Sequence, residues 1–227
     1  MILHILRYLV QNILSLPLRV ALFLFARFEV RGRENLKLID RKTGVIFAAN
    51  HKSQMDPLAV VSAVPFLSKL LPLYFVSIEA KYYDERRLPI GKYLYGSPFF
   101  KAFFGSYPIK KGLKNYAETL KQHEELLHQG RSVCIFPEGK RIYEEGMGEA
   151  HGGVSFLAHK TGATIIPVLI EGTLFSGYIR FFTFRQKIRV TFGKPTFFED
   201  IEPGHDNEHL NYKAAAENLM QKLPQLN

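Results

Sequence analysis

Short apolar runs alternate along this chain with segments whose apolar residues recur at helical spacing. The apolar runs predict strands at residues 44–49, 73–78, 107–109, 131–136, 163–170 and 188–192. The helical spacing predicts helices at residues 53–65, 113–129, 154–160 and 207–223. Strands that alternate with helices in this way predict an α/β fold, with a mixed, largely parallel sheet flanked by helices.

The first 30 residues are strongly apolar, but Arg7, Arg19 and Arg27 divide them into short pieces. A helix needs about 20 apolar residues to span a bilayer, and the longest uncharged piece, residues 8–18, is shorter than that. Pro17 predicts a break between two short helices. We therefore expect an apolar helical pair that lies in the membrane interface as a monotopic anchor.

Two other interpretations of residues 1–30 remain open. The pair can pack on the protein's own core, or the segment can be a signal peptide, although no small-x-small cleavage site is evident. The remaining residues, 31–227, have the length of one domain with a substantial core. We expect residues 1–30 to be the membrane-associating segment and residues 31–227 to be the main domain.

Composition and charge narrow the class of protein. Hydrophobic residues make up 47% of the chain and charged residues 22%, which excludes a disordered chain. The formal net charge of +9 favours anionic partners: a phosphate-bearing substrate, an acidic membrane or a nucleic acid. The single cysteine, Cys134, lies in an apolar strand, so we interpret it as a core residue in a reducing compartment rather than a nucleophile.

His51 directly follows the first predicted strand of the main domain, and Asp56 lies five residues further on. Ligands of parallel sheets bind beyond the carboxyl ends of the strands. Residues five apart do not share a helix face, but a turn between them brings the two side chains together. A carboxylate on one imidazole nitrogen fixes the tautomer, which leaves the other nitrogen to act as a general base. The alternative is a capping box at Ser53 and Asp56, in which Asp56 only begins a helix.

Two further clusters follow predicted strands. Lys110 and Lys111 come after residues 107–109, and residues 136–141 contain Gly139, Lys140 and Arg141. Glycine lets the backbone approach a ligand, and arginine binds phosphate with two parallel hydrogen bonds. Taken separately, each cluster is also explained as an ordinary charged surface turn. A parallel sheet brings both to the rim of His51, which predicts a base beside phosphate-binding cations.

Taken in their order along the chain, these clusters resemble the motifs of the glycerolipid acyltransferase family, specifically the 1-acyl-sn-glycerol-3-phosphate acyltransferases. The resemblance covers about residues 44–195. The resemblance implies that His51 is the general base and Asp56 its partner. It implies roles in substrate binding for Lys110, Glu138, Gly139, Lys140, Arg141 and Pro167. The family usually has arginine at the position of Lys110 and often threonine or serine at that of Lys140. These two departures bear on the identity of the acceptor.

The resemblance implies a single displacement, in which an acceptor hydroxyl attacks the thioester of acyl-CoA or acyl-carrier protein as co-substrate. No cofactor, metal or covalent enzyme intermediate is implied, and backbone amides near Gly139 are expected to stabilise the oxyanion.

The expected acceptor is 1-acyl-glycerol-3-phosphate, acylated at its sn-2 hydroxyl; glycerol-3-phosphate and other lyso-lipids remain alternatives. The expected partners are these substrates and a membrane surface. The expected location is monotopic on the membrane, with the active site facing the cytoplasm. An acyl groove or a lipid-facing surface is one interpretation of the aromatic tract at residues 93–104, and core packing is another.

The sequence also bears on three other classes of protein. The segment from His123 to His128 nearly matches a zinc-hydrolase motif, but its second histidine comes one residue late, so we interpret it as a solvated helix face. Nucleic-acid binding is not expected, because the basic residues are dispersed and no recognised motif is present. A catalytically silent membrane protein of the same fold remains open, and loss of activity in His51→Ala would distinguish the enzyme from it.

Overall fold

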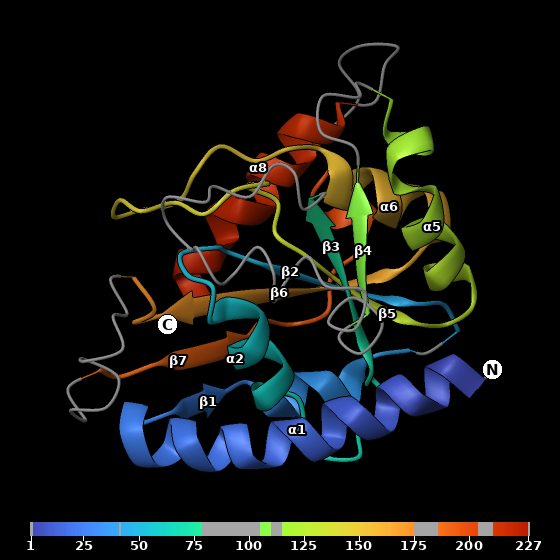
Figure 1. Cartoon of the computed structure of the whole chain (residues 1–227). Coiled ribbons are helices and arrows are strands. Elements are labelled where there is room, and N and C mark those ends of the chain that lie inside the picture. The colour runs from blue at the N-terminus through green and yellow to red at the C-terminus, as the bar shows by residue number, and fades with distance from the viewer. Residues whose placement is uncertain are drawn as a thin grey trace.

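The computed structural model describes residues 2–40, 42–78, 105–109, 115–174, 186–203 and 211–226. Within them, seven strands form one sheet in the order β1-β7-β6-β2-β5-β3-β4 (Figure 1). The strands are β1 (Glu29–Arg31), β2 (Val45–Ala49), β3 (Leu73–Ile78), β4 (Ser106–Ile109), β5 (Ser132–Ile135), β6 (Thr164–Glu171) and β7 (Arg189–Phe192). All neighbouring pairs are parallel except β6 and β7. The expected mixed, largely parallel sheet is confirmed.

Helices cover both faces of the sheet. The α-helices described are α1 (Ile2–Ala26), α2 (Asp56–Ala63), α5 (Tyr116–His128), α6 (Gly153–Thr161) and α8 (Tyr212–Lys222). Short 3-10 helices are η1 (Arg33–Leu38), η3 (Phe198–Asp200) and η4 (Leu223–Leu226). One hydrophobic core lies between the sheet and α5, α6 and α8, and a second lies between the sheet and α1 and α2 (Figure 1).

The sheet brings together the ends of strands that are far apart in the sequence. Because β2 lies between β5 and β6 and is parallel to both, the segments that leave these three strands emerge at one rim. The predicted strands match the observed ones to within a residue or two at each end. Two of the predicted helices, at residues 113–129 and 207–223, begin outside the described residues; α5 is described from Tyr116 and α8 from Tyr212.

The N-terminal segment is one continuous helix, so the predicted pair of short helices is wrong. Pro17 lies inside α1, which runs for 25 residues, or about 38 Å. A proline inside a helix removes one hydrogen bond and costs about 3 kcal/mol. Contacts on both sides of Pro17 offset this cost: Gln11 makes two hydrogen bonds of 2.8 Å with the Leu73 backbone, and Arg19 donates to the Val64 carbonyl.

The polarity of α1 is reversed relative to a helix on the surface of a soluble protein. Its buried side carries Arg7, Gln11, Asn12 and Ser15, each at most 7% exposed. Its outer side is apolar and exposed; Ile2, Ile13 and Phe23 are 82%, 66% and 72% exposed. Water disfavours such a surface, so the outer face is suited to a membrane interface or another apolar partner.

The C-terminal half of α1 is also part of the main core. Leu22 and Ala26 are fully buried against residues of β2 and α2. The boundary that we expected after residue 30 therefore does not separate two hydrophobic cores. By length and composition, α1 could also cross a membrane, with a mean hydropathy of 1.7 over its most apolar window. Its polar contacts, however, extend from His4 to Arg19 and bind it to β3, β4, the loop before β3 and the end of α2.

The interpretation of His123 as a solvated residue is wrong. His123 is fully buried on the same stripe of α5 as Leu120 and Leu127, and its ring packs edge-on to Tyr107 at 6.1 Å between centroids. Burial lowers the pKa of His123 from 6.5 to about 4. His128, in contrast, has an exposed side chain, 3.9 Å from Glu124. The two histidines therefore point in different directions, and no three potential metal ligands cluster within the described residues.

Candidate active site

The segment that leaves β2 is fixed to the sheet by Asn50. The buried Asn50 amide group donates to the Ile170 carbonyl at 2.9 Å and accepts from the Ile170 amide at 2.7 Å. These two bonds bind the end of β2 to β6, two strands whose pairing is otherwise only backbone to backbone. The chain therefore leaves the sheet at a defined position, directly before His51.

The His51 ring is held on two sides and open on a third. Its Nδ1 lies 2.8 Å from Oδ2 of Asp56, and the ring stacks on Phe136 with centroids 4.2 Å apart. The side chain is 18% exposed. Its Nε2 makes no hydrogen bond with any described residue. The ring is therefore oriented by the carboxylate, with its second nitrogen available to a ligand.

The Asp56 carboxylate also shapes the loop between the two residues. Oδ2 of Asp56 accepts hydrogen bonds from the amides of Lys52 and Ser53 at 2.6 and 2.7 Å, in addition to the His51 contact. Asp56 is fully buried and is the first residue of α2, whose N-terminus favours a negative charge. Half of the capping-box alternative is present, since the Ser53 amide donates to Asp56, while the Ser53 hydroxyl accepts from the Met55 amide at 3.2 Å instead of from the Asp56 amide. Asp56 also binds the His51 ring, so it does more than begin α2. The turn brings the two functional groups together, as the spacing predicted.

Glu138 is enclosed at the base of the site. It is fully buried; one carboxylate oxygen accepts from the His51 amide at 2.7 Å and the other from the Gly148 amide at 2.8 Å. The side chain thus ties the segment after β2 to the segment after β5. In this arrangement Glu138 positions His51, because both of its oxygens are occupied by backbone amides.

Gly139 lies in a turn that only glycine fits. Its φ is +62°, and a Cβ atom would lie 2.8 Å from the ring of His151. The Gly139 amide donates to the Phe136 carbonyl at 2.9 Å, so it is not available for an oxyanion. The next two amides, of Lys140 and Arg141, make no hydrogen bond within the described part of the chain. They are the free donors of this turn.

The turn that carries Lys140 and Arg141 is joined to the His51 loop through the backbone. The amide of Ile142, next to Arg141, donates to the His51 carbonyl at 2.8 Å, which places the Arg141 backbone against the His51 loop. The Arg141 guanidinium lies over the Tyr143 ring, 5.7 Å from its centroid, and forms no ion pair with any described carboxylate. Lys140 is exposed. Lys110 is outside the described residues, as is the aromatic tract at residues 93–104.

Pro167 lies within β6, opposite Ala48, and not at the rim with His51. Its carbonyl accepts from the Gly193 amide at 2.8 Å, on the side where β7 has ended. Because proline has no amide hydrogen, this is a position where a sheet tolerates it. The structure thus accounts for Pro167 through strand pairing, and its predicted role in substrate binding stays a prediction.

Two residues that the sequence did not single out also hold the site. The Lys52 ammonium donates to the Glu144 carbonyl at 2.6 Å and to the Gly146 carbonyl, which fastens the long segment after β5. His151 packs against Gly139, and its amide donates to the Pro137 carbonyl at 2.8 Å. Neither has a sequence signal, because each acts through a neighbour that only the fold brings near.

Cys134 does not contribute a nucleophile. Burial and the nearby Asp56 carboxylate raise the pKa of its thiol above the usual value, so the thiolate is strongly disfavoured. The residue is fully buried in β5, in agreement with its interpretation as a core side chain.

An open groove of about 740 Å³ adjoins the site. Asn50 and Lys52, on either side of His51 in the sequence, contribute to its wall. Its other walls come from residues 146–150, the end of β6, and α8 with the segment after it. Met147, Leu169 and Met220 make parts of these walls apolar, while Glu149, Glu171 and Glu217 make parts acidic.

Known proteins with similar sequences carry related names. The chain is 33% identical over 141 residues to a probable 1-acyl-sn-glycerol-3-phosphate acyltransferase of Mycoplasma genitalium, covering 62% of this chain and 48% of that protein. A protein of the same name from Mycoplasma pneumoniae is 30% identical over 133 residues, covering 59% and 46%. A lyso-ornithine lipid O-acyltransferase of Pseudomonas aeruginosa is 29% identical over 127 residues, covering 56% and 43%. The chain spans slightly less than half the length of these relatives.

A solved structure supports the fold. The crystal structure of the 1-acyl-sn-glycerophosphate acyltransferase from Thermotoga maritima superposes with a TM-score of 0.58 at 20% identity, over 92% of this chain and 76% of that one. The sequence motifs and the geometry around His51 agree with a match at the level of the family. The acyltransferase family model matches residues 27–171, more than half of the chain, and the chain belongs to that family.

Proposed function

We propose that this protein transfers a fatty acyl group from acyl-CoA or acyl-carrier protein to the sn-2 hydroxyl of 1-acyl-glycerol-3-phosphate, which yields phosphatidate. The observation that carries the proposal is the 2.8 Å contact between His51 Nδ1 and Asp56, with Nε2 facing away from it. Membership of the acyltransferase family and the names of the relatives support the reaction class.

The proposed reaction begins with proton transfer. Nε2 of His51 takes the proton of the acceptor hydroxyl, and the oxygen attacks the thioester carbonyl carbon. Asp56 stabilises the resulting imidazolium. The tetrahedral intermediate collapses, the carbon–sulfur bond breaks, and the imidazolium returns its proton to the leaving thiolate. General-base catalysis of this kind contributes about 10²–10⁴ in rate.

Two groups of donors support the charged species. The free amides of Lys140 and Arg141 are suited to the oxyanion, because the turn that presents them is anchored to the His51 loop through Ile142. The Arg141 side chain, without an ion pair among the described residues, is suited to the acceptor phosphate. Lys110 and Lys140 remain proposed as additional phosphate contacts. Pro167 remains proposed in acyl-donor binding.

We assign the groove beside the site to an acyl chain. Its apolar wall includes Met147 and Leu169, and its opening is flanked by the neighbours of His51. Met147→Trp, which narrows the groove, should lower activity with long acyl chains more than with short ones, as measured by competition between two donors. Glu145→Trp, on the exposed part of the same segment, is the control. Equal effects on both chain lengths would contradict the assignment.

The proposal includes attachment to the membrane surface through the outer face of α1, which is apolar and exposed. The helix would then lie in the interface rather than cross it, since its polar side is bonded to the sheet. The active site would face the cytoplasm, where thioester donors are available. Lysophosphatidate, which resides in the membrane, would reach the site from that surface.

The test is acyl transfer by the purified full-length chain. Labelled acyl-CoA and acyl-carrier protein are offered with lysophosphatidate, glycerol-3-phosphate and lyso-ornithine lipid, and the products are separated. We expect phosphatidate from the native protein, a loss of about 10²–10⁴ in kcat for His51→Ala, and a raised KM for the acceptor in Arg141→Ala. Full activity of His51→Ala would overturn the mechanism, and absence of transfer to any acceptor would overturn the function.

One other acceptor is favoured by a specific observation. The Pseudomonas aeruginosa relative is named for a lyso-ornithine lipid, an acceptor without a phosphate. Two cations in the turn after β5, Lys140 and Arg141, favour the phosphate-bearing acceptor. The same panel separates the two, because transfer to lyso-ornithine lipid should be unaffected by Arg141→Ala.

A further inference from the structure

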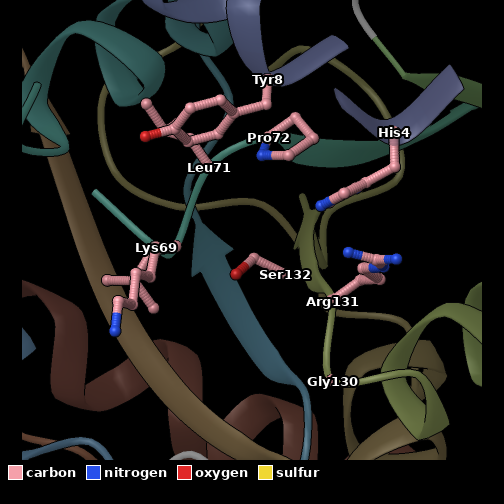
Figure 2. A pocket seen from close by; sticks show the side chains of 9 residues that line it. His4, Tyr8, Lys69, Leu71, Pro72, Gly130, Arg131 and Ser132 are labelled. Atoms are coloured by element: carbon pink, nitrogen blue, oxygen red, sulfur yellow. The ribbon is translucent and has the colours of Figure 1, made fainter. Parts of the chain in front are cut away.

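A second pocket lies at the opposite rim of the sheet, beneath the N-terminal half of α1. It has a volume of about 290 Å³ and is lined by α1, the loop before β3 and the start of β5 (Figure 2). Arg131 and Ser132 lie at the amino end of β5, whereas the catalytic turn follows its carboxyl end. At about 3.3 Å per residue, the strand separates the two sites by roughly 13 Å or more.

The pocket carries positive charge and no acidic side chain. Its cations are Lys69 and Arg131, and neither aspartate nor glutamate is among the residues that line it. Arg131 forms no ion pair within the described ranges. Figure 2 shows its guanidinium extending toward the ring of His4. Burial and the charge of Arg131 lower the pKa of His4 to about 4, so His4 is uncharged at neutral pH and leaves the pocket's charge to the two cations.

The walls of the pocket are held in place by hydrogen bonds. The Arg131 amide donates to the Leu126 carbonyl at 3.0 Å, and its carbonyl accepts from the Val45 amide at 3.1 Å. Asn12 accepts from the Leu67 amide at 2.7 Å, and Tyr8 donates to the Leu67 carbonyl at 3.0 Å. These bonds tie the loop that carries Lys69 to α1. The hydrogen bonds of the Arg131 backbone likewise fix the position from which its guanidinium extends.

The position of the pocket relative to α1 indicates what it binds. His4 and Tyr8 lie on the flank of α1 that faces the sheet, and the opposite side of the helix is the exposed apolar face. A helix with side chains is about 10–12 Å across, so the pocket lies about that distance above the apolar face. When that face is immersed in a bilayer, this height corresponds to the layer of lipid headgroups.

We propose that this pocket binds the phosphate of a membrane phospholipid headgroup, at a site separate from the catalytic centre. Arg131 grips the phosphate through two parallel hydrogen bonds. Lys69, whose side chain extends away from Arg131 in Figure 2, contributes only to the positive potential around the pocket. A bound lipid would hold the enzyme on the bilayer in one orientation. The inference goes beyond the proposed acyl transfer, since it requires no reaction.

The test measures binding of the full-length protein to phosphatidylcholine vesicles with and without anionic phosphatidylglycerol. Each basic side chain near an anionic surface contributes roughly fivefold in affinity. The double variant Lys69→Gln, Arg131→Gln should therefore bind the anionic vesicles roughly 25-fold more weakly. The matched control is Lys121→Gln, Lys160→Gln, which removes the same charge from exposed positions on α5 and α6 and should bind like the native protein. Equal losses in both would overturn the proposal.

A charge-conserving variant tests whether the pocket binds phosphate specifically. Arg131→Lys keeps the charge but loses the planar fork, so it should weaken binding severalfold if the pocket grips a phosphate. Unchanged binding would show that only the overall charge of the surface matters and would overturn the site.

Two further outcomes would also overturn it. Tight binding of inorganic phosphate without vesicles, combined with vesicle binding that ignores the pocket variants, would indicate a soluble anion instead of a lipid. Loss of acyl transfer to a water-soluble short-chain acceptor in the double variant would make the pocket part of the catalytic site. The main measurement is vesicle binding, so this proposal can be tested even if the protein does not catalyse the proposed acyl transfer.

Discussion

At the scale of single residues, the site depends on carboxylates that serve the backbone as much as the chemistry. Asp56 accepts from two loop amides and from the His51 ring, and Glu138 accepts from two amides of different segments. Both carboxylates are fully buried, so each amide that they bind would otherwise lose its partner. The orientation of His51 is therefore a property of the loops around it.

The Glu138→Gln variant tests this positioning. A glutamine presents one oxygen and one amide group, so one of the two backbone amides would face a donor instead of an acceptor. We expect a loss of about 1–3 kcal/mol in the free energy of unfolding, together with reduced kcat. Thermal melting and acyl-transfer kinetics measure the two effects. The control, Glu145→Gln, lies exposed in the same segment and should change neither. A native melting temperature in Glu138→Gln would contradict the role of Glu138 in holding the two backbone amides.

Burial of His123 makes the stability of the fold depend on pH. The pKa of His123 is about 4 in the folded protein and 6.5 in the unfolded chain, so acid protonates the unfolded state first. The contribution to stability is complete above pH 6.5 and is lost as the pH falls toward about 4, with a total on the order of 3 kcal/mol.

The His123→Phe variant should reduce this dependence. The difference in melting temperature between about pH 7 and about pH 5 should be smaller in this variant than in the native protein. His128→Phe, on the exposed side of the same helix, should retain the native difference. Identical pH profiles in all three proteins would contradict the assignment.

At the scale of elements, α1 departs furthest from the sequence prediction. Pro17 predicted a break, but the side chains of Gln11, Asn12 and Arg19 bind backbone groups of β3, of the loop before it and of the end of α2, and keep both halves in line. Local sequence could not reveal those partners, because they lie far along the chain. Strands β2, β5 and β6 were predictable because they are buried on both faces, which leaves continuous apolar runs, whereas the three-residue, partly exposed β1 was not predicted.

The outer face of α1 can be altered without touching its inner contacts. Replacing Ile13 and Phe23 with serine removes two of its most exposed apolar side chains. Burying such a side chain contributes about 1.5–3 kcal/mol, so we expect at least tenfold weaker binding to vesicles for the pair. The melting temperature in detergent should be native, since neither residue packs on the core. Unchanged vesicle binding would contradict the membrane assignment of this face.

At the scale of the whole molecule, the His51–Asp56 site was predictable and its scaffold was not. The two residues are close in sequence, so a short turn sufficed to predict their meeting. Glu138 and His51 are 87 residues apart, and only the pairing of β2 with β5 brings them together. The boundary expected after residue 30 followed composition, whereas the core extends into α1 through Leu22 and Ala26.

Deletion of residues 2–26 tests whether α1 is an appendage or part of the fold. The deletion removes two fully buried core residues and uncovers the Leu73 backbone groups that Gln11 binds. We expect an aggregated or unfolded product with no cooperative melting transition. Size-exclusion chromatography and calorimetry provide the measurement. A monodisperse, folded deletion variant would show that α1 is a separable anchor.

The outward apolar face of α1 has a kinetic consequence. An enzyme held at a bilayer meets its lipid substrate by lateral diffusion, so the relevant concentration is the mole fraction of substrate within the leaflet and not its amount per litre. Adding inert lipid at constant substrate would then slow turnover, although nothing in the active site has changed. For such a protein, surface dilution takes the place that volume dilution has for an enzyme in free solution.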